Sequence, residues 1–194
     1  MLNQEALDTL FTQARTHNAW LNKPITNGQL REIYELMKWA PTEFNCSPVR
    51  IAFLKSDEAK KKLIACMDED NAAKVKAAPI IAIVGTDMAF ARKLPALYPH
   101  AGAQAWLGSD EQKIAQAAIR NASIQGGYFI LATRATGLDC GPMLRFDAEK
   151  VDAAFFVGTA VKANFICGIG YGDEDVSAAR LPRLTFDASC AIVL

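Results

Sequence analysis

The sequence predicts an α+β or α/β fold, in which helices cover both faces of a central β-sheet. Short apolar runs rich in β-branched residues alternate along the chain with longer segments of helical period, and this alternation is typical of a sheet packed between helices. Two of the runs, residues 79–85 and 163–170, are nearly all apolar, which favours strands buried on both faces. The 194 residues contain no linker, repeat or low-complexity tract, so we expect a single domain spanning residues 1–194.

The N-terminal part of the chain predicts two helices. Residues 4–17 carry apolar side chains near helical period, and the segment 14–20 is expected to break into a loop. Thr26, followed three residues later by Gln29, is typical of a capping box at the start of the second helix. The buried stripe of this helix follows the spacing i, i+3, i+4, i+7 and consists of Leu30, Ile33, Tyr34 and Met37. Pro41 is expected to end it soon after.

The middle of the chain predicts two strands and a helix. Residues 49–54 are short, apolar and β-branched, as a strand would be. Ser56 is expected to cap a helix with a solvated lysine face, and the strand at 79–85 follows. Residues 86–108 have less regular patterning, so we expect a surface excursion there.

A long helix is predicted after Ser109, which forms a second capping-box pattern with Gln112. It is expected to run to about Arg134. Small side chains recur along it and would let another helix approach closely; these are Ala115, Ala118, Ala122 and Gly126. A buried core helix and a helix at a subunit interface explain this pattern equally well.

The C-terminal part predicts a loop, a short helix and two strands. Residues 136–147 are rich in turn formers, which favours a loop. Asp147 is expected to cap a short helix over 148–156. Residues 163–170 and 190–194 are the two apolar runs that predict strands.

Composition excludes several classes of protein. The net charge is zero, with 21 basic and 21 acidic residues, whereas nucleic-acid and membrane-surface proteins usually carry a basic excess. No apolar run is long enough for a membrane span, and the N-terminus shows no signal peptide. The odd count of five cysteines without a CxxC motif, and the two histidines, argue against a disulfide framework and a metal site. We therefore expect a cytoplasmic protein.

Cys46 is the most conspicuous residue of the loop APTEFNCSPVR, residues 40–50. A catalytic thiol is one interpretation, but no cation stands beside it in the sequence to lower its pKa. A small buried hydrophobe is the other interpretation, which we favour. The motif GIGYGD at 168–173 lacks the spacing and the following helix of a dinucleotide fingerprint, so its glycines are expected to end a strand and turn the chain.

Arginines in turns offer candidate phosphate ligands, because the guanidinium fork matches phosphate oxygens. Arg15 stands with Thr16 at the end of the first predicted helix, and Arg180 and Arg183 flank Pro182. For any one of these arginines taken alone, a surface salt bridge is the interpretation we favour. Their spacing in the sequence does not show whether they converge.

Several phrases, taken in order, resemble the nitroreductase-type flavoproteins. They are ARTHNAW (14–20), APTEFNCSPVR (40–50), NAAKVKAAP (71–79), YPH (98–100), GLDCGPMLRFD (137–147), GIGYGD (168–173) and ARLPRLTF (179–186). Together they span essentially the whole chain. Within this family the chain is similar to the subgroup of malonic semialdehyde reductases of pyrimidine degradation.

The resemblance implies an intertwined homodimer with a central mixed β-sheet sandwiched by helices, and two FMN molecules in its interface. The residues that fall where the family holds the FMN phosphate are Arg15, Thr16, Arg180 and Arg183. Those that fall where the partner's loop meets the flavin are Pro41, Thr42 and Asn45. Those that fall along the flavin ring are Asn71 and Lys74 at the pyrimidine edge and Pro142, Met143 and Leu144 near N5.

The resemblance also implies the chemistry. An NAD(P)H-dependent FMN oxidoreductase would work by ping-pong hydride transfer through flavin N5, with malonic semialdehyde as the favoured acceptor and nitro or quinone compounds as the alternative. FMN supplies the reaction, so no catalytic side chain is required; Lys74, with Asn18, is expected to tune the flavin electrostatically. The rival hypotheses are a flavin-binding module without turnover and a thiol enzyme centred on Cys46.

The chain departs from the pattern of the family at three places along the sequence. Asn18 stands where many relatives carry a cation. Leu144 and Arg145 replace two small residues, and Arg145 is expected to face either solvent or an anionic substrate. The residues TEF at 42–44 replace smaller ones, and either Glu43 or Phe44 is expected to shape the pocket.

Overall fold

Four antiparallel strands form the central sheet of the protein. A computed structural model of the chain describes residues 1–100, 110–173 and 179–193. The strands are β1 (Val49–Leu54), β2 (Ile80–Asp87), β3 (Asp139–Met143) and β4 (Val161–Gly170), in the spatial order β1-β2-β4-β3. All three pairings between these strands are antiparallel. Among the described residues, the mixed character that the resemblance implies is limited to a parallel bridge between Thr16 and Cys140 of the edge strand β3.

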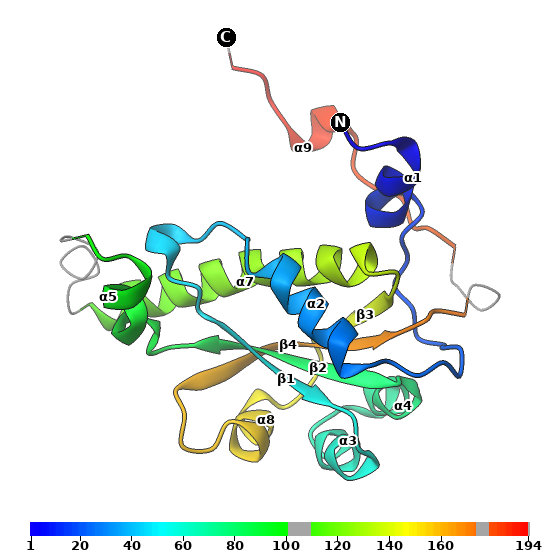
Figure 1. Cartoon of the computed structure of the whole chain (residues 1–194), viewed down its shortest axis with the longest axis horizontal. Coiled ribbons are helices and arrows are strands. Elements are labelled where there is room, and N and C mark those ends of the chain that lie inside the picture. The colour runs from blue at the N-terminus through cyan, green and yellow to red at the C-terminus, as the bar shows by residue number, and fades with distance from the viewer. Residues whose placement is uncertain (101–109, 174–178, 194) are drawn as a thin grey trace.

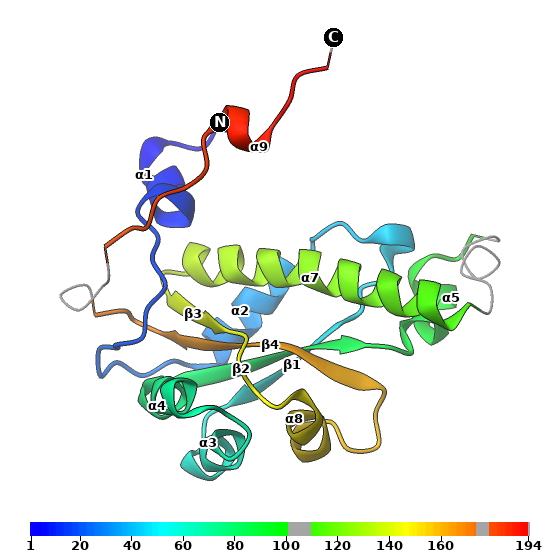
Figure 2. The same cartoon turned by 180° about the vertical axis from the view of Figure 1, so that it is seen from behind.

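Helices cover both faces of this sheet, as the sequence predicted (Figures 1 and 2). On one face lie α2 (Asn27–Met37) and the long α7 (Glu111–Ala135); on the other lie α3 (Asp57–Ile64), α4 (Glu69–Ala77) and α8 (Ala148–Phe155). The residues of β2 alternate between the two cores: Ala82 and Val84 pack on the α2/α7 side, and Ile81 and Ile83 pack on the α3/α4/α8 side. This strand is buried along its whole length, which confirms the prediction from its apolar run.

Local sequence signals set several helix starts. Thr26 and Gln29 form the predicted capping box of α2. Ser56 caps α3 and Asp147 caps α8, each accepting a hydrogen bond from a backbone N–H three residues on. The predicted cap of α7, Ser109, lies outside the described residues; Asp110 accepts from the Lys113 N–H and is the N-cap that the structure describes.

Two predictions in the C-terminal part were wrong. Residues 136–147 are not one loop, because β3 lies within them. Gly141 and Pro142 are poor strand formers, but β3 is an edge strand, where a missing proline N–H is tolerated. The run at 190–193 forms no strand, and Leu194 lies outside the described residues. The side chains of Ile192 and Val193 are exposed, and this run pairs with none of the four described strands.

The helical segments at the edges of the fold are short. The N-terminal segment forms α1 (Gln4–Leu7) and continues as a π-helical turn, Asp8–Thr12. The predicted excursion after β2 contains a 3₁₀ turn, Phe90–Lys93, and α5 (Leu94–Leu97). Near the C-terminus lies α9 (Phe186–Ser189). None of the helices in the described part of the chain is long and apolar enough to cross a membrane.

Both terminal segments project from the same end of the layered body (Figure 1). Large apolar side chains of residues 179–193 are exposed there; they are Leu181, Leu184, Phe186, Ile192 and Val193. Exposed apolar side chains on an extended segment are typical of a surface that another chain covers.

Candidate active site

The segment after the first helix lies directly against the edge strand β3. The His17 N–H donates to the Cys140 carbonyl at 3.1 Å. A Cβ at Gly141 would lie 2.2 Å from the His17 carbonyl oxygen, a contact that no side chain could relieve by changing rotamer. The absence of a side chain at Gly141 therefore allows residues 15–18 to run alongside the sheet.

The glycines of the GIGYGD motif make room for the same segment. β4 ends at Gly170, as predicted for a motif that is not a dinucleotide fingerprint. A Cβ at Gly170 would lie 2.4 Å from the Trp20 ring, and one at Gly172 would lie 2.2 Å from His17 Nδ1. His17 is buried, with Nε2 3.4 Å from an Asp139 carboxylate oxygen. The motif thus has a packing role that fixes the position of residues 17–20.

The four residues predicted to bind phosphate line one pocket at the end of this edge. It has a volume of about 430 Å³, and its polar lining consists of Arg15, Thr16, Arg134, Arg180 and Arg183. The sequence did not indicate Arg134 as a site residue, because it ends the amphipathic pattern of α7 and a basic residue in the last turn of a helix is common. The structure therefore brings the predicted group together and adds a fourth guanidinium to it.

Three of these guanidinium groups, those of Arg15, Arg134 and Arg180, bind backbone carbonyls at the end of the N-terminal helical segment. Arg134 Nη1 donates to Leu10 O at 2.9 Å, and Arg180 Nη2 donates to Ala14 O at 2.9 Å. Arg15 Nη1 donates to Ala14 O at 3.1 Å. Such contacts satisfy carbonyls that the helix leaves without partners. They position the arginines but do not neutralise their charge.

The charge in this pocket is uncompensated within the part of the chain that the structure describes. No described carboxylate forms an ion pair with Arg15, Arg134, Arg180 or Arg183. Desolvation, and then the positive charges of the other three arginines, lower the pKa of Arg180. The Nε of Arg134 is buried without a hydrogen-bond partner. A phosphate in the pocket would supply the negative charge that these arginines do not find in an ion pair with the described residues.

A second group of predicted residues lies along the edge strand and α4. Asn71 is buried, and its Nδ2 donates to the Arg145 carbonyl at 3.0 Å. Lys74 Nζ donates to Asn71 Oδ1 at 3.3 Å, so this pair ties α4 to the chain just after β3. Asn18 Oδ1 lies 3.8 Å from the position of a Cβ on Gly141. Of the three residues near the end of β3, Met143 is buried, Pro142 is half-buried and Leu144 is exposed.

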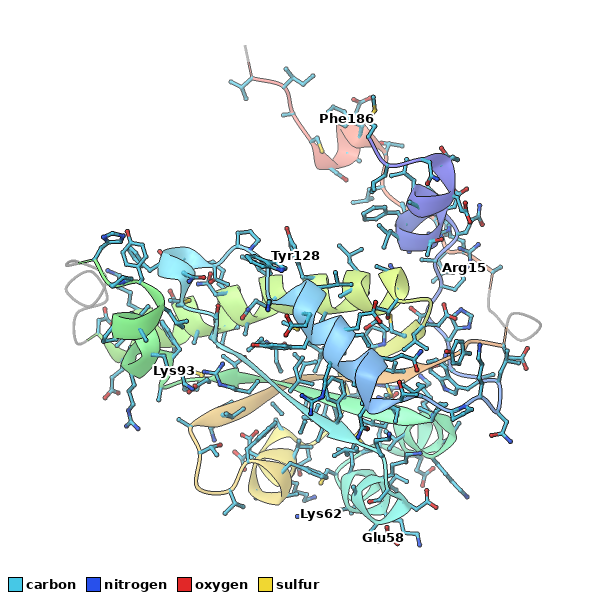
Figure 3. All side chains as sticks on the ribbon, in the orientation of Figure 1. Arg15, Glu58, Lys62, Lys93, Tyr128 and Phe186 are labelled. Atoms are coloured by element: carbon cyan, nitrogen blue, oxygen red, sulfur yellow. The ribbon has the colours of Figure 1, made fainter. Side chains whose placement is uncertain are left out.

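The third group, Pro41, Thr42 and Asn45, lies at the opposite end of α7. The Glu43 N–H donates to Asn121 of that helix at 2.8 Å, and Asn45 Nδ2 donates to Leu97 O of α5 at 2.9 Å. Asn121 and Arg134 are thirteen residues apart on α7, which corresponds to about 20 Å along the axis. Figure 3 shows Arg15 at the other end of α7 from α5. One chain therefore does not bring this group to the other two.

The remaining candidates are engaged in structural contacts. Cys46 is buried, and burial is the main cause that raises its pKa to about 11, which argues against a nucleophilic thiol. Arg145 is largely exposed, with Nε 3.2 Å from Asp68 and Nη2 3.1 Å from Asp70. Its guanidinium faces these two carboxylates at the protein surface. No group of three or more side chains that could hold a metal occurs among the described residues.

Comparison with known proteins identifies the family. The sequence matches the nitroreductase family over residues 12–172. A relative from Polynucleobacter asymbioticus, provisionally named NADH dehydrogenase/NAD(P)H nitroreductase, is 50% identical over 193 residues, covering 100% of this chain and 98% of its own. A relative from Stenotrophomonas maltophilia with the same provisional name is 50% identical over 191 residues, with 98% and 97% coverage.

Solved structures share the fold at low sequence identity. A nitroreductase from Exiguobacterium sibiricum, described as a complex with FMN, superposes with a TM-score of 0.86 at 16% identity, covering 100% of this chain and 99% of its own. A gut-bacterial enone reductase superposes with a TM-score of 0.85 at 15% identity, covering both chains completely. The family match and the close relatives together show that this chain belongs to the nitroreductase family.

Proposed function

We propose that the protein is an NAD(P)H-dependent FMN oxidoreductase. The observation that carries the proposal is the convergence of Arg15, Arg134, Arg180 and Arg183 on one pocket, where none of them forms an ion pair with a described carboxylate and the donor set suits a phosphate ester. The proposal that NAD(P)H is the electron donor is supported by the provisional names of the relatives. The proposal that the flavin is FMN is supported by the Exiguobacterium structure, which is described as a complex with FMN. The five cysteines are all free, which supports a reducing, cytoplasmic setting.

The residues along the glycine-lined edge would bind and orient the cofactor. The arginines and the Thr16 hydroxyl would hold its phosphate. Asn18 and the C-terminal end of β3 would lie along its ring. FMN, when bound, accepts a hydride from NAD(P)H and passes it to the acceptor. Lys74 carries a positive charge next to Asn71, and a cation at the flavin edge favours the charge that develops there on reduction.

We further propose that two copies of the chain complete each site. Pro41, Thr42 and Asn45 would reach the flavin held by the other copy, because they lie at the far end of α7 from the arginine pocket. The outer face of α7 supports this, since Ile119, Ile124 and Tyr128 are exposed there and Tyr128 points away from the sheet in Figure 3. Sedimentation equilibrium should give a mass about twice that of the 21.1 kDa chain; the mass of one chain would contradict the proposal.

Two classes of acceptor are proposed for the reduced enzyme. Malonic semialdehyde follows from the resemblance of the sequence to its reductases and would yield 3-hydroxypropanoate. Nitro and quinone compounds follow from the provisional names of the relatives. The position of Arg145 favours the second class, because Asp68 and Asp70 already occupy the guanidinium that would bind the carboxylate of malonic semialdehyde.

The function is tested by anaerobic reduction and reoxidation of the FMN-loaded protein. Bleaching of the flavin by NADH or NADPH, followed by reoxidation on adding an acceptor, is the expected result. Initial rates with malonic semialdehyde, a nitroarene and a quinone then rank the acceptors. Protein that binds FMN but is not reduced by either nicotinamide would be a flavin-binding module, and protein that binds no FMN would overturn the proposal.

A further inference from the structure

The loop between α2 and β1 has an unfavourable backbone that its own residues do not explain. Phe44, Asn45 and Ser47 have φ angles of 51°, 53° and 40°, in the left-handed region that residues with a Cβ seldom occupy. None of them is glycine. Three such residues within four positions persist only if the surrounding structure holds them, and strained backbone of this kind gathers at ligand contacts.

Two buried amides on one face of α7 hold both ends of this loop. Asn121 Oδ1 accepts the Glu43 N–H at 2.8 Å, and Gln125 Oε1 accepts the Val49 N–H at 3.0 Å. Each side chain is only 2% exposed, and the two are one helical turn apart. Asn121 is itself fixed, because its Nδ2 donates to Ala117 O at 2.8 Å. The strained residues therefore lie between two anchors on a rigid helix.

Further hydrogen bonds hold the loop, one within the loop itself and others to the strands β1 and β2. The Ser47 N–H donates to Thr42 Oγ1 at 3.2 Å, and Arg50 Nη1 donates to Ser47 O at 3.0 Å. Arg50 is held in turn by Asp87 of β2 at 2.7 Å. Asn45 and Pro41 remain exposed, so the loop presents a fixed shape to whatever lies outside it.

We propose that Asn121 and Gln125 are positioning residues that fix residues 42–48 in the shape needed to contact the cofactor. This inference rests on the proposed function. Neither amide touches the ligand; each acts through the backbone of the loop. Buried amides cost more than apolar side chains in a helix core unless they are hydrogen-bonded, and here both amide oxygens accept from the backbone at the two ends of the strained loop.

The test replaces each amide by an apolar residue of similar size. In Asn121→Leu and Gln125→Met, hydrogen exchange of the amides at 43–49 should become faster in the protein without FMN, since the anchors are lost. The dissociation constant of FMN should rise about tenfold, and the KM of the acceptor should rise more than kcat falls. Thr133→Val is the matched control, because its buried hydroxyl bonds to Phe129 O within the same helix and does not reach the loop.

Two more variants separate positioning from general damage. Asn121→Asp keeps an acceptor for the Glu43 N–H but loses the donor to Ala117 O, so its exchange rate at 43–49 and its FMN dissociation constant should fall between those of the wild type and of Asn121→Leu. Ser47→Gly removes the strain at one position and should recover part of the FMN affinity lost in Asn121→Leu.

The outcomes distinguish this inference from the proposed function. Unchanged exchange at 43–49, or faster exchange with unchanged FMN affinity and acceptor KM, would overturn the positioning role. If the wild-type protein bound no FMN, the proposed function would fail and the cofactor role of the loop with it, while the exchange data would still report on the two anchors.

Discussion

Replacing Arg180 by alanine is expected to weaken FMN binding about 10- to 100-fold and to leave the binding of riboflavin nearly unchanged. Riboflavin has the same ring and ribityl chain as FMN but no phosphate, so the comparison isolates the contribution of the arginine pocket. Hydrogen bonds to charged groups contribute about 1.5–3 kcal/mol, and each 1.4 kcal/mol corresponds to about tenfold in affinity. Fluorescence titration with both flavins measures the difference.

Arg180 also binds the backbone of the N-terminal segment, so its loss could act through structure alone. Arg31→Ala controls for charge, because Arg31 is an exposed arginine of α2 outside the pocket. Arg180→Lys keeps the charge but not the fork, and should recover only part of the affinity. Equal loss of FMN and riboflavin affinity in Arg180→Ala would show that the residue supports the fold and not the phosphate.

The parts of the fold that were predicted from the sequence are those that local chemistry decides. The capping box of α2 and the limits of β1 follow from a few neighbouring residues. The strand β3 was missed because Gly141 and Pro142 resemble a turn, and only the neighbouring β4 makes that segment extended. The C-terminal run has the composition of a strand but pairs with none of the strands in the described part of the chain. For both segments, pairing with a distant strand determines whether a strand forms, and the local sequence pattern contains no information on that pairing.

The candidate site divides in the same way. Arg15, Arg180 and Arg183 could be named from the chemistry of phosphate binding and from family resemblance, but their convergence depends on how the terminal segments meet. Arg134 was missed because helical periodicity already explained it. The left-handed backbone at Phe44 and Ser47 could not be predicted, because these residue types do not favour it and the anchoring amides lie more than seventy residues away.

Gly141→Ala is expected to destabilise the protein by about 1–3 kcal/mol, because the added methyl group overpacks the edge of the sheet. It should also weaken the binding of both FMN and riboflavin. The new Cβ would lie 2.2 Å from the His17 carbonyl oxygen. That atom belongs to the backbone, so the whole segment 15–18 must move away from β3. Arg15 and Thr16 would leave the arginine pocket together with Asn18, which we propose to lie beside the flavin ring.

Gly28→Ala is the matched control for this substitution. A Cβ at Gly28 meets only Thr26 Oγ1, at 3.5 Å, and alanine within α2 should be neutral or stabilising by up to about 1 kcal/mol. Thermal unfolding measures both variants, and titration with the two flavins separates Gly141→Ala from Arg180→Ala. Displacement of the segment should lower affinity for both ligands, whereas loss of one guanidinium should lower affinity for FMN alone. Wild-type stability in Gly141→Ala would contradict the close approach of residues 15–18 to the sheet, and with it the alignment of the arginine pocket and the edge strand as one cofactor site.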